Sequence, residues 1–374
     1  MRQSSRQAIV TCALGATWIL SAALVTPLTA QRADSTTRSD SVGRRRIQPL
    51  PALASAPETG LQYGATVLAV WEPAAYRKTR PSSLTASALR TAKAQTRIRL
   101  EGERWTRGNA QRITGSLQWQ EFPLPYYGVG DRTPKAAEET FTPKGTEAIV
   151  TLQQRIARSW YLSAGARHLE QRITTDSTGA LGTQPVTGNA GGTMTEWSTG
   201  LLTDTRDNLF SPHAGDWIQL TYARSVQGAW SDYSYGTLKL DARSYRTIGT
   251  GHVLATQLQL TNVDGTAPFD QLALVGSGDI LRGYARGRYR DRAMAAWQGE
   301  YRTPIRHRLG AVAFVGAGSV SPTLNGIISH RLLPTYGAGL RVEIDHRQRT
   351  GVRADYGRGR DGASGLYIGF NNAF

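Results

Sequence analysis

The residues from which hydrolytic or metal chemistry could be built are few and poorly arranged in this sequence. The single cysteine, Cys12, lies near the N-terminus, which excludes disulfide bonds within one chain and Cys-based metal sites. None of the six histidines adjoins a recognisable nucleophile motif, and Ser277 between two glycines lacks the spacing of a nucleophile elbow. No group of His, Asp and Glu has metal-ligand spacing. The sequence therefore predicts no catalytic residue, no metal and no cofactor, and we do not expect an enzyme.

A more specific pattern is the run Asp204, Thr205, Arg206, Asp207 and Asn208, which lies at the expected end of a strand. Asp and Asn side chains accept hydrogen bonds from nearby backbone N–H groups in turns, and an Arg two residues from an Asp can pair with it locally. The simplest interpretation of this motif is therefore a structured turn.

Strands must position these motifs, because the chain shows strand periodicity from residue 60 onward. Apolar and polar residues alternate in segments of about ten residues, as in Ile218, Leu220 and Tyr222, and no helical period is convincing. A soluble sandwich produces the same alternation. Three features favour a membrane barrel: charged residues on the alternate face, strands long enough for a tilted span, and aromatic residues near strand ends. These aromatic residues are Trp105, Trp119, Trp160, Tyr161 and Trp217.

The N-terminal segment 1–30 predicts a secretory signal peptide. Arg2 and Arg6 form a basic start, and an apolar run follows that is short for a membrane span. Residues 31–59 are rich in Ser, Thr, Pro, Arg and Ala without apolar periodicity, so we expect a flexible periplasmic lead-in there. The barrel is expected over residues 60–374.

The formal charge of +16 raises the question of nucleic-acid binding. The predicted export signal argues against a nucleic-acid partner, and the basic residues are spread along strands and turns. The run 44–46, three arginines, is most simply a solvated part of the lead-in.

Connection lengths predict the strand count. Outer-membrane barrels alternate short periplasmic turns with long extracellular loops. Residues 82–105 contain no Gly, Pro, Asn or Asp before Gly102, so we treat them as one strand. Short and long links then alternate, with 72–81 among the long ones and 207–215 among the short ones. The count is about 14 strands, with about 16 as the main alternative; a hairpin turning near Lys93 would break the alternation.

Several motifs together resemble the BamA/TamA superfamily of outer-membrane barrels, also called the bacterial surface antigen family. The turn motif is followed by Gly-Ser-Gly-Asp-Ile-Leu-Arg-Gly-Tyr at 276–284, Glu-Tyr-Arg-Thr-Pro at 300–304 and Tyr-Gly-Ala-Gly-Leu-Arg at 336–341. Phe374, closing an alternating strand, resembles the C-terminal signature of such barrels. The resemblance covers residues 60–374 and implies an all-β fold, a transmembrane antiparallel barrel in the bacterial outer membrane.

The resemblance also implies a loop anchor. In that family an Arg-Gly-aromatic tip on a long extracellular loop folds into the lumen, and the Arg meets a Glu on the next strand and an Asp on the one after. Arg282, Gly283 and Tyr284 match the tip, and Glu300 matches the Glu. An Arg–carboxylate fork in a partly dehydrated lumen is strong and directional, which suits pinning a loop. The alternative interpretation is ordinary packing inside the lumen.

The chain departs from the family pattern in two ways. Gly316 stands where the family has the Asp, so we expect an anchor with one carboxylate, with Asp279 and Asp291 as candidates to compensate. Substituting Gly316→Asp should then protect the loop further. Residues 31–59 are too few for a periplasmic domain of the kind that receives a client, so the sequence looks like a short, barrel-only branch.

Two functions follow as expectations. The first is a role in outer-membrane biogenesis or in transport of protein or lipid, with a separate periplasmic partner protein and contact with outer-membrane lipid and lipopolysaccharide. The second is a passive pore whose Arg-rich lumen favours anions. The loop 264–290 discriminates between them: a lumenal plug held by Arg282 argues for the first, and an open bore argues for the second.

Overall fold

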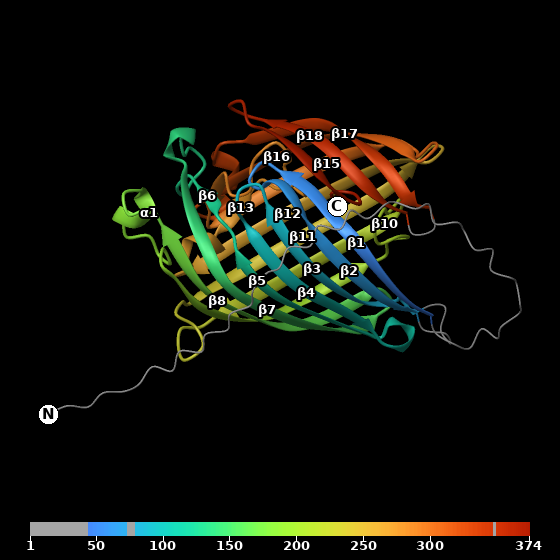
Figure 1. The fold of residues 1–374 in the computed structure, drawn as a ribbon, viewed down its shortest axis with the longest axis horizontal. Coiled ribbons are helices and arrows are strands. Elements are labelled where there is room, and N and C mark those ends of the chain that lie inside the picture. Colours follow the sequence, from blue (N-terminus) through green and yellow to red (C-terminus); the bar gives the residue numbers. More distant parts are fainter. Residues whose placement is uncertain (1–43, 73–78, 347–348) are drawn as a thin grey trace, which may run out of the picture. The chain divides into compact units, whose positions relative to one another are not determined.

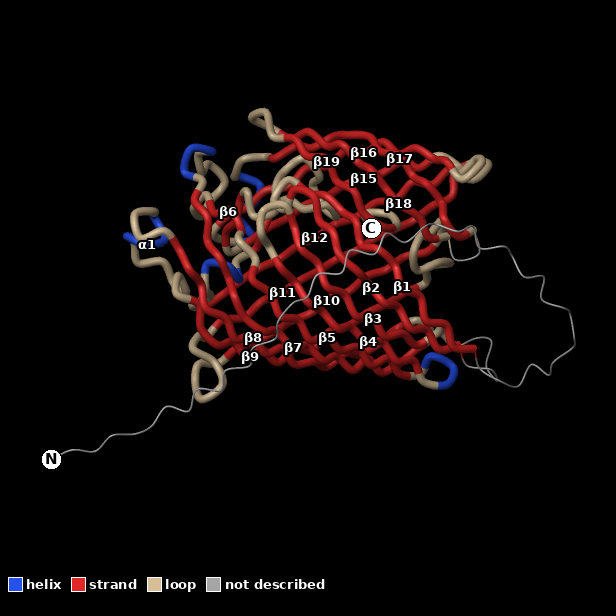
Figure 2. Tube along the Cα trace, viewed as in Figure 1, coloured by secondary structure: helices blue, strands red, loops and turns tan. Residues whose placement is uncertain are grey.

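A computed structural model describes residues 44–72, 79–346 and 349–374 of the chain. Its principal feature is a closed antiparallel barrel of 16 strands, each paired with its neighbour in the sequence (Figure 1). Figure 2 shows the near and far walls of this barrel as strands that cross at an angle. The barrel strands are β1 (Arg44–Ala56), β2 (Gly60–Glu72), β3 (Ser82–Thr91), β4 (Thr96–Trp105), β5 (Gln111–Glu121), β7 (Glu139–Ala157), β8 (Trp160–Thr175), β9 (Gly191–Asp204), β10 (Gly215–Ser225), β11 (Tyr235–Ile248), β12 (His252–Gly265), β15 (Ala293–Arg302), β16 (Leu309–Ser321), β17 (Leu333–Asp345), β18 (Thr350–Gly359) and β19 (Ser364–Phe370).

The connections contain only short elements. Among the described residues, no helix has the length and apolar character needed to cross a bilayer. The short elements are the strands β6 (Leu124–Tyr126), β13 (Ala273–Val275) and β14 (Tyr289–Asp291), the helix α1 (Ala180–Thr183), and 3₁₀ turns at Arg107–Asn109, Lys135–Ala137, Phe269–Gln271 and Leu324–Ser329.

The outer face of the barrel carries apolar side chains that a soluble protein would bury. On β10, Ile218, Leu220 and Tyr222 are 37%, 41% and 42% exposed. The residues between them lie on the opposite face, where the Gln219 amide donates to Thr221 Oγ1 (3.2 Å). Rows of exposed apolar side chains alternating with inward polar ones are typical of a barrel in lipid. This arrangement separates the barrel from the soluble sandwich that the alternation alone left open.

The strand count matches the alternative of 16, because the segment 82–105 is a hairpin of β3 and β4 and not one strand. In its turn, Thr91 Oγ1 donates to Gln95 Oε1 (2.7 Å). Gln95 is fully buried, and its amide donates to Glu58 O (3.1 Å) and Pro123 O (2.6 Å). A Thr hydroxyl and a Gln amide therefore hold a turn that lacks Gly, Pro, Asn and Asp, the residues that usually indicate one.

The other additional strand is β1, which lies within the expected lead-in 31–59. It pairs with β2 along its whole length. Its Pro49 and Pro51 are compatible with a strand at a sheet edge, where a missing N–H leaves no partner unsatisfied. The lead-in prediction is therefore wrong for Arg44–Ala56. The expected signal peptide and the rest of the lead-in, up to residue 43, lie outside the described residues.

The two ends of the barrel carry different connections. We call them the long-loop end, with connections 122–138, 176–190, 226–234, 266–292 and 322–332, and the short-link end, with connections such as 158–159 and 249–251.

The expected placement of 72–81 among the long loops is wrong. Two hydrogen bonds tie its described part to the short-link end, where β4 turns into β5. Gly108 N donates to Thr79 Oγ1 (2.9 Å), and Arg80 N donates to Asn109 Oδ1 (2.7 Å).

Most of the aromatic residues expected at the lipid interface lie elsewhere. Trp105 and Tyr161 pack edge to face, with ring centroids 6.2 Å apart, and Trp217 packs against the same cluster. The guanidinium of Arg80 stacks on Trp105 at 5.0 Å, a favourable cation–π contact. These three rings therefore pack inside the barrel near the short-link end. Trp160, by contrast, is 44% exposed.

The last strand ends earlier than expected. β19 stops at Phe370, and Asn371 has a φ of 58°. Phe374, expected to close the strand, is 5% exposed and packs on Tyr245, with ring centroids 6.5 Å apart. Arg302 Nη2 donates to Phe374 O (2.8 Å). Phe374 therefore belongs to the interior and not to a lipid-facing strand.

Candidate functional site: the lumenal loop and its anchor

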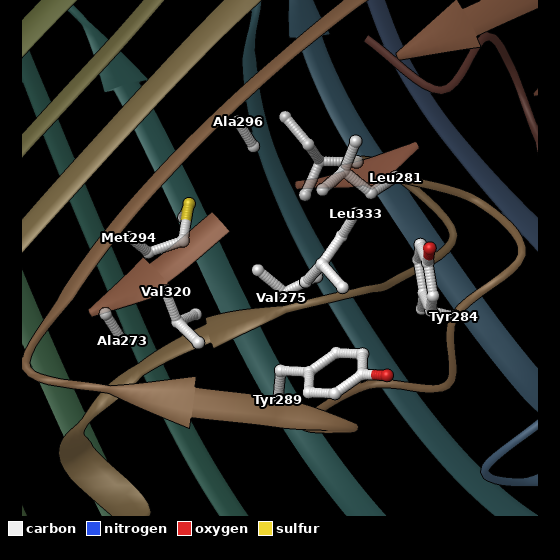
Figure 3. Close-up of a cluster of buried hydrophobic side chains, with 10 residues drawn as sticks. Ala273, Val275, Leu281, Tyr284, Tyr289, Met294, Ala296, Val320 and Leu333 are labelled. Carbon is white, nitrogen blue, oxygen red and sulfur yellow. The ribbon is translucent and has the colours of Figure 1, made fainter. Parts of the chain in front are cut away.

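The connection between β12 and β15, residues 266–292, folds back into the barrel. Within it, β13 pairs with β14 in antiparallel register. Figure 3 shows apolar side chains of this loop gathered with others from the barrel wall. Apolar burial contributes about 25 cal/mol per Å², so packing favours the lumenal position. The cluster comprises Ala273, Val275, Ile280, Leu281, Tyr284 and Tyr289 from the loop, and Met294, Ala296, Val320 and Leu333 from the wall.

The loop tip adopts a backbone path that depends on glycine. Leu281 has a φ of 51° and Gly283 a φ of 119°. A Cβ at Gly283 would lie 2.7 Å from the backbone carbon of Arg358, so no larger residue fits against β18. Gly283 N donates to the Tyr367 hydroxyl (2.9 Å). The tip that carries Arg282 is therefore fixed against β18 and β19.

Tyr284 holds the same tip from its other side. The side chain is fully buried, its hydroxyl donates to Pro334 O (2.8 Å), and the same oxygen accepts from Arg360 N (2.8 Å). The Tyr367 hydroxyl donates to Tyr284 O (3.0 Å). A buried tyrosine whose hydroxyl is hydrogen-bonded stabilises the loop tip through apolar burial of its ring and fixes its orientation through the hydrogen bonds.

Arg282 lies between two carboxylates. Its Nη2 is 2.7 Å from Glu300 Oε2 and its Nη1 is 2.7 Å from Asp355 Oδ2, and all three side chains are 0% exposed. Its guanidinium carbon lies 3.6 Å from the centroid of the Phe314 ring. Burial would lower the pKa of Arg282, but the two carboxylates raise it above its usual value. The structure thus brings Arg282 and Glu300 together and adds a second carboxylate.

Three further arginines share the same two carboxylates. Arg302 lies 2.7 Å from Glu300, Arg341 lies 2.5 Å from Asp355 and 3.5 Å from Glu300, and Arg353 lies 3.1 Å from Asp355. Removing one partner from a buried ion pair costs roughly 3–5 kcal/mol. We call Arg282, Glu300, Arg302, Arg341, Arg353 and Asp355 the anchor cluster.

Nowhere in the described ranges do three or more His, Cys, Asp or Glu gather in a way that could hold a metal ion.

Sequence reasoning missed Asp355 and offered two other aspartates. Asp279 pairs with Arg353 (3.1 Å) at the edge of the cluster, and Asp291 forms no ion pair with any described residue. The expectation of a single-carboxylate anchor is therefore wrong. The signal that could have identified Asp355 is a charged residue on the inward face of an alternating strand, between the outward Ala354 and Tyr356.

The wall strand β15 and the loop leave little room for a side chain at position 316, where this chain has glycine in place of the family Asp. A Cβ at Gly316 would lie 2.8 Å from Trp297 O and 3.1 Å from Leu281 Cδ2. A Cβ at Gly318 would lie 2.5 Å from Leu281 Cδ1. The Leu281 side chain thus occupies the space into which a larger side chain at position 316 would extend, and Asp355 supplies the carboxylate from β18 instead.

The motif at 204–208 forms a turn held by its own side chains. The Asp204 carboxylate lies 2.9 Å from Arg206 Nε and 2.9 Å from Arg80 Nη1. Asn208 Oδ1 accepts from Ser211 N (2.8 Å). These contacts agree with turn architecture at the short-link end.

The Asp207 carboxylate should make this turn sensitive to pH. It accepts from His213 N (2.9 Å) and Ala214 N (3.2 Å), and Arg349 Nη1 lies 2.7 Å away. Burial alone would raise the pKa of Asp207, but these hydrogen bonds and Arg349 lower it. A lowered folded-state pKa means that the stabilisation is complete above the ordinary Asp value of about 3.9 and is lost as the pH falls below it.

We therefore expect hydrogen-exchange protection of the His213 and Ala214 amides, corrected for intrinsic rates, to fall in acid. Asp207→Asn should remove most of this pH dependence, because the amide does not titrate. Equal acid sensitivity in the wild type and in Asp207→Asn would contradict the assignment.

Comparisons with known proteins agree with this architecture. Residues 80–369 match the Omp85 superfamily domain. BamA from Haemophilus ducreyi lacking POTRA domains 1–3 is similar in structure, with a TM-score of 0.58 and 15% identity over 88% of this chain and 70% of that one. No curated protein sequence matches significantly.

Two CdiB structures are also similar. CdiB from Acinetobacter baumannii gives a TM-score of 0.56 at 14% identity, covering 87% of this chain and 65% of that one. CdiB from Escherichia coli gives a TM-score of 0.61 at 11% identity, covering 86% and 62%. The chain thus spans less than two thirds of either CdiB chain. At these identities the likeness shows the fold.

Proposed function

Because the chain belongs to the Omp85 superfamily, we propose that it serves outer-membrane biogenesis or the transport of protein or lipid. The observation that carries the proposal is the seam between β1 and β19, where the barrel closes. The lumenal loop supports the same function, because a bore that holds an anchored loop makes a poor passive channel. The anion-favouring pore is the alternative, and the loop counts against it.

The seam is held by much less strand pairing than the rest of the barrel. β1 and β19 pair at Ser55 and Ile368, whereas β1 pairs with β2 over its full length. β19 ends at Phe370, two residues past Ile368, so the part of β1 before Leu53 extends beyond it. This part of β1 has no strand partner other than β2 among the described residues. Unsatisfied backbone groups are costly in hydrocarbon, so the free edge of β1 favours pairing with a further strand.

A client polypeptide would use this edge by strand addition, in which main-chain hydrogen bonds supply affinity with little demand on sequence. It would arrive from the short-link end, where β1 begins, with a separate periplasmic partner protein delivering it. The exposed apolar rows on the outer face would meanwhile contact outer-membrane lipid, including lipopolysaccharide.

A disulfide across the seam tests the proposal. Cysteines at Ser55→Cys and Ile368→Cys would lock β1 to β19, and the only native cysteine, Cys12, lies far from both in the sequence. The matched control places cysteines at the directly paired Thr66 and Ser87 of β2 and β3, a ladder that is already continuous. Each variant is used to complement a deletion strain, and the outer-membrane protein and lipid profiles are compared.

We expect the seam-locked protein to fail under oxidising conditions and to recover when reduced, with the control pair active in both. A seam-locked protein that complements as well as the control would contradict the proposal and favour the passive pore, whose conduction needs no open seam.

A further inference from the structure

A second feature of the interior lies away from the anchor cluster. A chamber of about 390 Å³ lies between strands β4, β5, β7 and β8 and the loop segment 270–290. The chamber carries five arginines and three carboxylates. These charged lining residues are Glu58, Arg97, Arg99, Glu147, Arg167, Asp270, Arg286 and Arg290.

Three of the chamber's arginines have no carboxylate partner. No described acidic side chain lies within ion-pair distance of Arg97, Arg286 or Arg290. Glu147 is already engaged by Arg167 (2.6 Å). In the anchor cluster, by contrast, every arginine meets a carboxylate. The chamber therefore holds three guanidinium groups that form no ion pair with a described carboxylate, while Arg99 and Arg167 are paired with Glu101, Glu147 and Glu196.

Arg290 is the most deeply buried of the three, with 3% exposure. Its Nη1 and Nη2 reach only the carbonyls of Phe269 (3.3 Å) and Pro125 (3.4 Å), and its Nε has no hydrogen-bond partner. The Tyr126 ring lies 4.9 Å from the guanidinium. Burial, with repulsion from Arg286, lowers the pKa of Arg290 to about 10. Asp270 attracts Arg290 from beyond ion-pair distance, but no carboxylate contacts the guanidinium directly. A buried cation without a direct ion pair is costly, so an anion in the chamber would stabilise it.

Arg97 also has a donor without a partner, and the Arg286 side chain forms no ion pair with a described residue. Arg97 stacks on the Phe122 ring at 4.2 Å and donates to Gln120 Oε1 (3.2 Å), while its Nε is buried without a partner. Arg286 is exposed, so the chamber communicates with water. Asp270 Oδ2 accepts from the Gln171 amide (2.6 Å), whereas its buried Oδ1 has no hydrogen-bond partner.

We propose that this chamber binds the phosphate group of a small phosphorylated ligand. Guanidinium groups donate to phosphate oxygens in a matched, bidentate geometry, and a phosphate offers enough acceptors for several of them at once. The volume lies at the low end of small-molecule sites, about 300–1,000 Å³. It accommodates a sugar-sized phosphate ester or a lipid headgroup, without acyl chains.

Titration calorimetry on the full chain in detergent tests the assignment, with glucose 1-phosphate as the probe and glucose as its uncharged match. Arg286→Gln is the main variant, because this exposed side chain makes no ion pair whose loss could disturb folding. Arg97→Gln is the second variant. Arg224→Gln is the control, because it removes the same charge at a residue that pairs with Asp264 outside the chamber.

Glucose 1-phosphate should bind the wild type and glucose should not. Arg286→Gln and Arg97→Gln should each weaken binding by about tenfold or more, and Arg224→Gln should leave it unchanged. A parallel arm uses phosphatidylcholine vesicles with and without phosphatidic acid. Arg286-dependent binding of phosphatidic acid alone would assign the phosphate to a lipid headgroup.

The absence of binding by both phosphate probes would overturn the proposal, as would equal weakening by Arg224→Gln. Neither result concerns the seam between β1 and β19. Failure of the phosphate-site assignment would therefore leave the proposed function unaffected, and the reverse holds as well.

Discussion

Replacing Arg282 with alanine should release the loop 266–292 from the lumen while the barrel strands stay paired. The change removes both ion pairs, to Glu300 and Asp355, and the contact with the Phe314 ring. Loss of one partner from a buried ion pair costs roughly 3–5 kcal/mol. Chymotrypsin should therefore cleave after Tyr284 far faster in the variant, whereas heat-modifiable gel migration, which reports the folded barrel, should persist.

The matched control for this experiment is Arg286→Gln, a change on the same loop at an exposed residue without an ion pair. It should remain as resistant as the wild type. Arg282→Lys should be intermediate, because a lysine keeps the charge but cannot bridge two carboxylates with a planar fork. A loop that stays protected in Arg282→Ala would mean that apolar packing alone holds it.

The second large effect is expected for Gly316→Asp, in the direction opposite to the one that the family pattern suggests. The added Cβ would lie 2.8 Å from Trp297 O and 3.1 Å from Leu281 Cδ2, so the backbone at Trp297 and the Leu281 side chain must both shift, and the carboxylate beyond the Cβ would press further on Leu281. Overpacking of this kind costs roughly 1–3 kcal/mol. Chymotrypsin cleavage of the loop should therefore be faster than in the wild type.

Gly228→Asp is the control for this prediction, because a Cβ at Gly228 meets nothing within 4 Å. It adds the same charge without a clash and should leave the cleavage rate unchanged. Greater protection in Gly316→Asp than in the wild type would show that the position still accepts the carboxylate and that Asp355 is a partial substitute.

Much of the fold could be predicted from the sequence, because a lipid-facing strand must alternate apolar and polar residues. The errors occurred where side chains replaced the usual turn residues or where a strand lay at an edge. Thr91 and Gln95 close a hairpin that no Gly or Asn indicates. Pro49 lies in β1, where an edge tolerates it.

The site was predictable only in part. Arg282 and Glu300 were identified because both lie within short motifs. Asp355 contacts Arg282 across 73 residues of sequence, and that contact exists only because barrel closure brings β18 beside the loop tip. Leu281 likewise fills the space beside Gly316 from a distant segment. A single sequence carries no direct record of such packing.

The central claim, that an anchored loop occupies the lumen, is tested most directly by ion conductance in planar lipid bilayers. We expect the wild type to show little steady conductance and Arg282→Ala to show frequent large openings, with Arg286→Gln behaving as the wild type. Stable wild-type conductance equal to that of Arg282→Ala would contradict the claim.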